Sequence, residues 1–171
     1  MEIKRPPATF KFEVPPHVVI VEARFYDTIA DLQLQGVKQV LDRVEATYEV
    51  ITVPGALEIP AAIGFAIKAL DFDPIRRRPD GFIALGCVLK GGTNHDQIVG
   101  VESAHSLQEL AMHHKLAIGN GILTCNTMEQ ALERADAIRL NRGGAAAEAC
   151  LRMIELKHYF RLSPKRRWTA K

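Results

Sequence analysis

The sequence predicts an α/β fold built on a four-stranded parallel β-sheet. Four apolar, β-branched runs are each followed by a segment whose apolar residues recur at helical spacing, so strand and helix alternate along the chain. The connections are short, and strand–helix–strand units of this kind form right-handed crossovers that place helices on both faces of a parallel sheet. We therefore expect a three-layer αβα sandwich, flavodoxin-like in outline, in which ligands bind beyond the carboxyl ends of the strands.

The first two strand–helix units fill the first half of the chain. The β-branched run HVVIVEA (His17–Ala23) predicts a strand, and Asp27 is a candidate N-cap for the helix that follows, with apolar residues at helical spacing up to Val44. The run TYEVITV (Thr47–Val53) predicts the second strand. The helical segment IPAAIGFAIKAL comes next, and it tolerates Pro60 because proline fits the first turn of a helix.

The second half repeats the pattern. The continuously apolar run from Phe82 to Leu89 is typical of a strand covered on both faces, and it leads into a helix expected from about His95 to His114. The fourth strand is LAIGNGILT. Thr127 with Gln130 then fits a capping box at the start of another helix, and the small-residue run that begins GGAAAEA supplies the last helix.

The length of 171 residues suits one domain, because a chain of this size buries roughly 70% of its unfolded surface around a single core. We assign this domain to residues 17–162. Residues 1–16 contain four prolines, which favour an extended N-terminal arm over a helix. Residues 163–171 are basic, and we expect a disordered, solvated tail.

Composition argues against several classes of partner. The net charge of +2 gives little general attraction to nucleic acid or to an anionic membrane, so neither is expected as a partner. No run approaches the ~20 apolar residues of a membrane span. The three cysteines are odd in number and form no CxxC pair, which favours reduced thiols in an intracellular compartment. We expect a cytoplasmic protein.

A glycine-rich loop precedes the third helix. The free amides at a helix start bind phosphate or carboxylate, and Gly91 and Gly92 would let a ligand approach the main chain beside Thr93. Lys90 adds a positive charge. Such a turn is also common for structural reasons alone. The loop matches neither GxxxxGK[ST] nor GxGxxG, which argues against a nucleoside triphosphate or a dinucleotide.

Four other side chains are candidates, each with a structural alternative. A neutral imidazole at His95 could shuttle a proton beside an anion site, or it could simply fill the helix start. Phe25 could stack on a planar heterocycle or cap the core. Glu58 could accept hydroxyl hydrogen bonds or be a solvated acid, and Arg134 reads as an exposed helical charge within one subunit. The remaining histidines lack partners at ligand spacing, so no metal is expected.

Six ordered motifs carry a family resemblance. They are ARFYD, VPGALEIP, GCVLKGGTNHDQIVGVESA, GNGILT, EQALERA and NRGGAAAEA, and they run from about Val18 to Ile154. Together they resemble the 6,7-dimethyl-8-ribityllumazine synthase family of riboflavin biosynthesis. The resemblance implies condensation of 5-amino-6-(D-ribitylamino)uracil with 3,4-dihydroxy-2-butanone 4-phosphate to give the lumazine, phosphate and water, without metal or organic cofactor.

The resemblance also implies roles for individual residues. His95 would transfer protons. The substrate phosphate would be bound by Lys90, Gly92, Thr93 and, from a neighbouring subunit, Arg134. The pyrimidine and ribityl groups would contact a larger set drawn from all four strand–helix units: Phe25, Ala56, Leu57, Glu58, Cys87, Val88, Leu89 and Asn120.

Several positions depart from the commonest family pattern. Lys90 stands where arginine is usual, which keeps the charge but loses bidentate geometry. After the histidine the family usually has an aromatic residue and then an acid, whereas this chain has Asp96 and Gln97, so the carboxylate that would orient the histidine is displaced by one position. Asn120 occupies a site often held by phenylalanine, and Ile138 replaces a frequent lysine.

The resemblance further implies an assembly. Family members form homopentamers, in some cases twelve of them in a 60-subunit icosahedral shell, with active sites at subunit interfaces and the N-terminal arm added to an adjacent subunit's sheet. Riboflavin synthase is the partner implied by the pathway. Two alternatives stay open: a catalytically weak paralogue that acts as a shell or as a flavin- or lumazine-binding protein, and a flavodoxin-like FMN protein of electron transfer.

Overall fold

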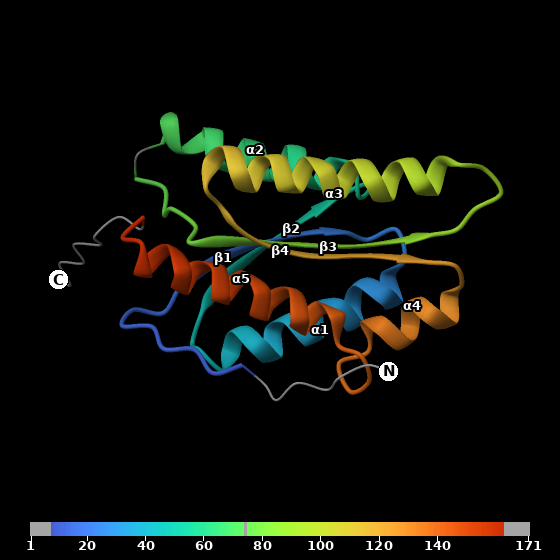
Figure 1. The fold of residues 1–171 in the computed structure, drawn as a ribbon, viewed down its shortest axis with the longest axis horizontal. Coiled ribbons are helices and arrows are strands. Elements are labelled where there is room, and N and C mark those ends of the chain that lie inside the picture. Colours follow the sequence, from blue (N-terminus) through green and yellow to red (C-terminus); the bar gives the residue numbers. More distant parts are fainter. Residues whose placement is uncertain (1–7, 74, 163–171) are drawn as a thin grey trace.

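A single parallel sheet lies between two layers of helices (Figure 1). The computed structural model describes residues 8–73 and 75–162. The sheet consists of β1 (His17–Ala23), β2 (Thr47–Val53), β3 (Gly81–Leu89) and β4 (Ala117–Cys125) in the order β2-β1-β3-β4. Every neighbouring pair is parallel. This confirms the α/β class and the three-layer, flavodoxin-like arrangement.

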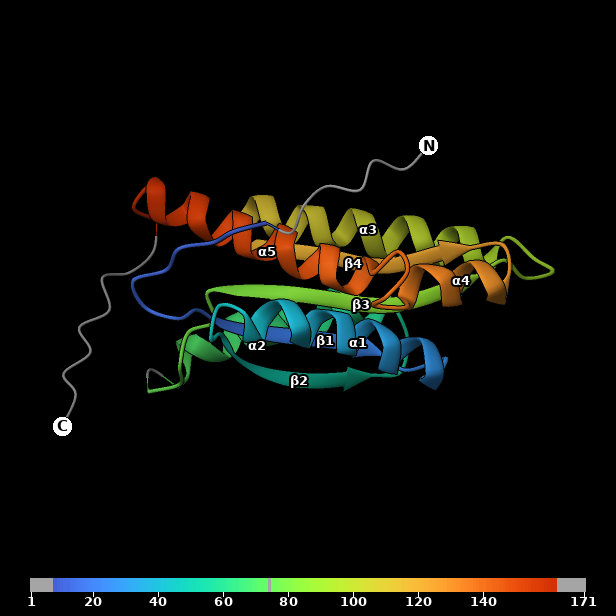
Figure 2. The same cartoon turned by 90° about the horizontal axis from the view of Figure 1, so that it is seen from below.

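The helices divide between the two faces of the sheet (Figures 1 and 2). One face carries α2 (Glu58–Lys68), which ends in the 3₁₀ turn η1 (Ala69–Asp71), and α3 (His95–His114). The other face carries α1 (Asp27–Asp42), α4 (Met128–Ala135) and α5 (Arg142–Tyr159). Right-handed crossovers on both sides of β1 account for this division.

The helix starts depart from the prediction in detail. The N-cap of α1 is Tyr26, so Asp27 is already helical and the prediction of Asp27 as the cap was wrong by one residue. At α4 the Thr127 hydroxyl accepts from the Gln130 N–H at 3.3 Å, as a capping box requires. The Gln130 side chain accepts from the N–H of Asn126, one residue before the cap. The predicted box is therefore confirmed on one side and displaced on the other.

The core has two halves because successive residues of a strand face opposite sides of the sheet. Val18 and Ile20 of β1 pack in the cluster formed with α1 and α5, whereas Val19 and Val21 pack in the cluster formed with α2 and α3. The first seven residues of β3 are all buried, as expected for a strand covered on both faces. Each fully buried aliphatic side chain contributes about 1.5–3 kcal/mol to folding.

The sheet and α5 approach each other closely at one glycine. A Cβ atom built on Gly119 of β4 would lie 2.0 Å from the carbonyl oxygen of Ala146 in α5. Real Cβ atoms do not approach backbone this closely, so glycine at this position permits the packing of α5 onto the sheet.

The described part of the N-terminal arm lies against its own α5. Phe10 stacks near Phe12, and the Arg152 guanidinium lies 4.9 Å from the centre of the Phe10 ring. The Lys11 N–H donates to the Glu155 carboxylate at 3.2 Å. These contacts hold residues 8–16 on the helix without forming a strand. Residues 1–7 and the predicted basic tail, 163–171, lie outside the described residues.

Across residues 8–73 and 75–162, the helices are too short or too polar for any of them to cross a membrane.

Candidate active site

One cavity opens at the carboxyl edge of the sheet, where the predicted loops meet. Its volume is about 490 Å³, and the loops after β1, β2 and β3 form its walls. Its lining residues are Ala23, Phe25, Tyr26, Pro54, Gly55, Ala56, Leu57, Glu58, Cys87, Val88, Leu89, Gly91, Thr93, His95, Asp96 and Val99. Three of the four loops that the fold predicted as ligand-binding therefore converge on a single space.

The β1–α1 loop places an aromatic ring at the rim. Phe25 is 72% exposed, and it borders the cavity. Its ring makes an edge contact with Tyr26 at 5.0 Å between centroids. An exposed ring at a cavity mouth offers a face on which a planar heterocycle can stack. This arrangement favours the ligand-stacking interpretation of Phe25 over the core-capping one.

The β2–α2 loop supplies an acid and an apolar wall. Ala56 is buried, whereas Leu57 and Glu58 are exposed beside the cavity. A tight turn precedes the helix, in which the N–H of Glu58 donates to the carbonyl of Gly55 at 3.2 Å. The Glu58 carboxylate folds back over Gly55, since a Cβ there would lie 2.8 Å from it. The acid therefore stays beside the cavity while remaining exposed to solvent.

The glycines after β3 have no explanation within their own subunit. In the part of the chain that the structure describes, neither Gly91 nor Gly92 has a positive φ, and a Cβ built on either would meet nothing within 4 Å. Neither a strained turn nor a close contact inside the subunit therefore requires glycine. A ligand or a second subunit that comes close to the main chain would require it.

His95 is the first residue of α3, and it borders the cavity. Its N–H points back to the Thr93 hydroxyl at 3.4 Å, and no side-chain cap satisfies the helix start at Asn94. The next residue, Asp96, accepts from the Gly91 N–H through Oδ1 at 3.4 Å. Asp96 is the carboxylate that stands one position away from the usual family pattern, and it contacts the glycine loop.

The end of β3 contributes a neutral wall. Cys87 is buried, and burial, reinforced by the proximity of Cys125, raises the pKa of its thiol to about 12. The thiol therefore stays protonated at physiological pH and acts as a small apolar group. Val88 and Leu89 extend this wall toward the glycine loop.

Four predicted site residues do not border the cavity. Lys90 and Gly92 are exposed beside it, and the N–H of Lys90 pairs with the carbonyl of Cys125 at 2.9 Å. Asn120 is exposed on β4, where its Oδ1 accepts from the Ile122 N–H. Arg134 lies on α4, and its guanidinium donates to the Gln130 carbonyl at 3.1 Å. The loop after β4, residues 125–127, also follows the carboxyl end of a strand, but none of its residues lines the cavity.

Several lining residues were not singled out from the sequence. Tyr26, Pro54 and Val99 border the cavity, and each lies within a motif that was recognised. Only the tertiary arrangement shows which side of a loop faces the cavity. Among the described residues, no group of three histidine, cysteine or acidic side chains could hold a metal ion.

A parallel α/β sheet with an imidazole, a carboxylate and an aromatic ring around one cavity is typical of an enzyme that acts on small molecules. The family model described as 6,7-dimethyl-8-ribityllumazine synthase matches residues 15–158. The chain belongs to the 6,7-dimethyl-8-ribityllumazine synthase family, transferases of riboflavin biosynthesis.

Curated relatives of this family are similar to the chain over most of its length. A 6,7-dimethyl-8-ribityllumazine synthase from Bartonella tribocorum is 53% identical over 145 residues, which cover 85% of this chain and 92% of that protein. The 6,7-dimethyl-8-ribityllumazine synthase 1 of Rhizobium meliloti is 53% identical over 84% of this chain and 92% of its own. The protein of that family from Agrobacterium fabrum is 54% identical over 83% of this chain and 95% of its own.

Proposed function

We propose that this chain condenses 5-amino-6-(D-ribitylamino)uracil with 3,4-dihydroxy-2-butanone 4-phosphate to give 6,7-dimethyl-8-ribityllumazine, phosphate and water. One observation carries the proposal: His95, Thr93, Phe25 and Glu58 come from three separate loops and border the same cavity. Together they offer a proton carrier, an anion-facing hydroxyl, a stacking face and a hydroxyl acceptor. Both reactants need such groups at once.

The reaction requires that the two substrates be held close together and that protons be transferred. The amine attacks the ketone and water leaves, giving an imine; phosphate is then eliminated, and a second amine–carbonyl condensation closes the ring with loss of another water. Each step moves a proton, and no step transfers electrons to an external acceptor. An enzyme gains most here by holding two reactants together and by placing one acid–base group beside them. His95 is that group in our proposal.

The pyrimidine substrate is proposed to bind between Phe25 and the apolar wall. The wall consists of Ala56 and Leu57 together with the neutral strand end 87–89. Stacking on the exposed ring would contribute about 0.5–1.5 kcal/mol beyond the area it buries. The Glu58 carboxylate is proposed to accept hydrogen bonds from ribityl hydroxyls.

The phosphate is proposed to lie over the glycine loop and the start of α3. The positive end of the helix dipole and the loop amides favour an anion there, and Thr93 adds a hydroxyl. The unexplained glycines at 91 and 92 support this placement, because nothing in the subunit uses their lack of a side chain. Lys90 adds charge from outside the cavity.

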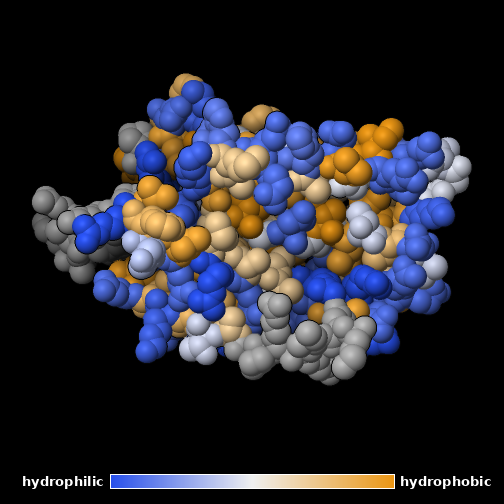
Figure 3. Space-filling model, viewed as in Figure 1, coloured by the Kyte–Doolittle hydropathy of each residue, from blue (hydrophilic) through white to orange (hydrophobic). Residues whose placement is uncertain are grey.

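A neighbouring subunit is proposed to complete the site with Arg134 and Asn120. Neither residue borders the cavity of its own subunit. The surface also favours association: α3 has 20 residues of which two are buried, and it exposes Ile98, Val101 and Met112. Apolar patches interrupt the hydrophilic surface on the side where α3 lies (Figure 3). We propose a homopentamer, with a 60-subunit shell as its larger form.

A rate assay tests the reaction. Incubation of the purified protein with both substrates should produce the absorbance and fluorescence of the lumazine. A protein that assembles, binds riboflavin tightly and shows turnover near background would instead support the catalytically weak paralogue. The curated relatives do not favour that alternative, since all those cited above carry the synthase name. Light scattering on the same sample distinguishes a pentamer from a shell.

Complementation tests the shared site. His95→Ala and Arg134→Ala should each be nearly inactive alone, and co-expression should restore activity because about a quarter of the shared sites regain both side chains in a random mixture. The homogeneous variants, mixed only after assembly, are the control. No recovery on co-expression would argue against an arginine supplied in trans. We also propose a cytoplasmic location, with riboflavin synthase as the protein that consumes the product.

A further inference from the structure

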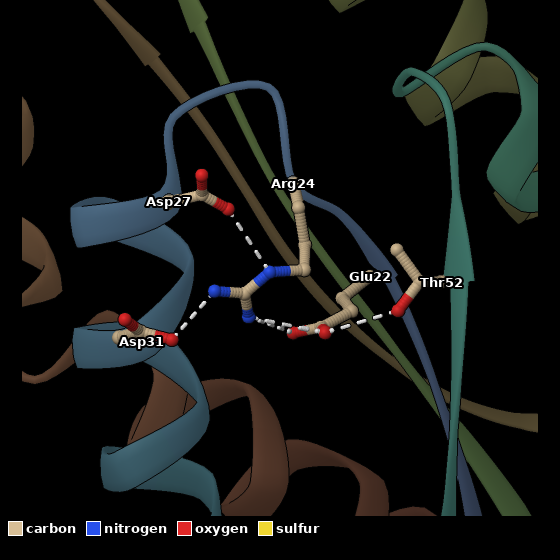
Figure 4. A network of polar contacts seen from close by, with 5 residues as sticks. All are labelled: Glu22, Arg24, Asp27, Asp31 and Thr52. Atoms are coloured by element: carbon tan, nitrogen blue, oxygen red, sulfur yellow. Dashed lines mark hydrogen bonds and ion pairs between the residues drawn. The ribbon is translucent and has the colours of Figure 1, made fainter.

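Arg24 is held by three carboxylates, one from β1 and two from α1 (Figure 4). Its Nη2 donates to Asp31 at 2.6 Å, its Nε donates to Asp27 at 3.1 Å, and its Nη1 donates to Glu22 at 3.2 Å. The hydrogen bond to Asp31 is the largest of the interactions that raise the pKa of this guanidinium above its ordinary value. One side chain thus joins a strand to the first two turns of a helix.

The anchor on the strand side is a buried acid. Glu22 is 3% exposed, and it pairs in register with Thr52 of β2, whose hydroxyl donates to the Glu22 carboxylate at 3.3 Å. A buried carboxylate is costly unless it is paired and hydrogen-bonded. Arg24 therefore has a partner that cannot turn away into solvent, and this fixes one end of the loop.

The anchor on the helix side is formed by acids one turn apart. Asp27 and Asp31 stand four residues apart in α1, so both face the same side of the helix. The helix has no side-chain cap at Tyr26. The guanidinium therefore links the first turn of α1 to the strand that precedes it, where no side-chain cap does so.

Phe25 lies between Arg24 and the start of α1, and its ring borders the cavity, which Arg24 does not line. The residue before it binds acids of β1 and α1. At 72% exposure the ring has little packing of its own beyond the edge contact with Tyr26. Its direction is therefore set by the backbone that Arg24 holds.

We propose that Arg24 is a positioning residue for the heterocyclic substrate: it fixes the β1–α1 loop so that Phe25 presents its ring at the cavity before the substrate arrives. A loop that is ordered in advance loses less entropy when the substrate stacks. The inference rests on the proposed function for the identity of that substrate, and it adds a residue that does not line the cavity.

Arg24→Lys is the decisive variant, because an ammonium keeps the charge but cannot direct separate donors at three carboxylates. The KM for the pyrimidine substrate should rise about three- to tenfold, which corresponds to the loss of one aromatic stacking contact. The KM for the phosphorylated ketone should change little, since that substrate does not stack. Equal rises in both KM values, or no rise in either, would overturn the proposal.

Asp31→Asn is a milder variant in case the lysine substitution impairs folding. Its carboxylate is 68% exposed, so its loss should spare the fold. Glu22 and Asp27 would still hold the guanidinium, so the same KM should rise less than in Arg24→Lys. Arg43→Lys is the matched control. Arg43 pairs with Glu148 at the far end of α1, and neither KM should respond to its replacement.

A double-mutant cycle separates positioning from general stability. If Arg24 acts through the ring, Arg24→Lys should add almost nothing to the pyrimidine KM once Phe25→Ala is present. Additive effects would show that Arg24 works by another route. A wild-type chain without turnover would refute the proposed function but not the positioning role of Arg24.

The positioning role is then tested by fluorescence anisotropy of Phe25→Trp in a Trp168→Phe background. Arg24→Lys should increase the mobility of the new tryptophan at position 25, and unchanged mobility would refute the positioning role.

Discussion

The N–H of Gly91 donates to Oδ1 of Asp96 across a distance of 3.4 Å. The chain thereby places an anion of its own at an amide of the loop where we propose that phosphate binds. One donor cannot serve two anions fully, and two neighbouring negative charges repel each other. Asp96 and the substrate phosphate are therefore expected to compete.

Asp96→Asn should relieve this competition. The amide side chain keeps a hydrogen-bond acceptor but removes the negative charge, so the KM for the phosphorylated ketone should fall about threefold, and inorganic phosphate should inhibit at lower concentration. Steady-state rates with each substrate varied in turn measure both effects. Asp42→Asn, at the exposed end of α1, is the charge-matched control. An unchanged KM together with unchanged phosphate inhibition would show that Asp96 does not compete.

His95→Gln should lower kcat by about 10²–10⁴ if the imidazole carries the protons of the reaction. Glutamine keeps polar atoms beside the cavity but cannot exchange a proton, so riboflavin binding should stay within a few fold of wild type. Stopped-flow fluorescence measures kcat, and equilibrium titration measures the affinity for riboflavin. His105→Gln, on an exposed position of the same helix, should leave kcat unaltered. A wild-type kcat in the His95 variant would remove the imidazole from the mechanism.

His17 should make stability depend on pH. Burial lowers the pKa of this histidine below its ordinary 6.5, with the charge of Arg77 as a second cause, while Glu49 opposes both. The unfolded chain then takes up a proton near pH 6.5 that the folded chain takes up only at lower pH. The free energy of unfolding should therefore fall as the pH drops below 6.5, by less than about 1.4 kcal/mol per pH unit.

Urea denaturation at fixed protein concentration from pH 7.5 downward would measure this dependence. His17→Asn keeps a side chain that can pair with Thr47, but it has no proton to gain. Its free energy of unfolding should vary less with pH than that of wild type. If the two curves were parallel, His17 would not be the responsible group.

Gly119→Ala should destabilise the fold by about 1–3 kcal/mol, because the new methyl group would collide with the carbonyl of Ala146 and push α5 away from the sheet. Gly64→Ala is the natural comparison. Gly64 lies inside α2 with open space around it, and alanine there should stabilise by about 0.5–1 kcal/mol. Chemical denaturation measures the free energy of unfolding of each variant and so distinguishes destabilisation from stabilisation. An unchanged free energy in Gly119→Ala would mean that α5 can shift freely.

The fold could be predicted from the sequence because each strand carries its own pattern. The β-branched run before Arg24 and the continuous apolar run before Lys90 have the strand boundaries expected, to within a residue. The meeting of three loops at one edge also follows from parallel topology alone. These are consequences of periodicity and chain direction, which a sequence shows directly.

The remaining features depend on side-chain geometry that no local pattern encodes. The sequence predicted Asp27 as a helix cap, but its carboxylate accepts from Arg24, and the helix begins one residue earlier, with Tyr26 as its N-cap. Asp96 looked like a displaced partner for the histidine, and its recorded partner is Gly91. In each case a short polar side chain could reach several partners, and the tertiary structure determines which of them it contacts.

The N-terminal arm packs on α5 of its own subunit, and this affects how subunits would associate. Phe10 and Lys11 are already engaged with Arg152 and Glu155 of their own α5. An arm that joined a neighbour's sheet would first have to be released from this helix, so association would begin with an intramolecular detachment. The speed of assembly would then reach a ceiling at high protein concentration, set by that detachment instead of by collision.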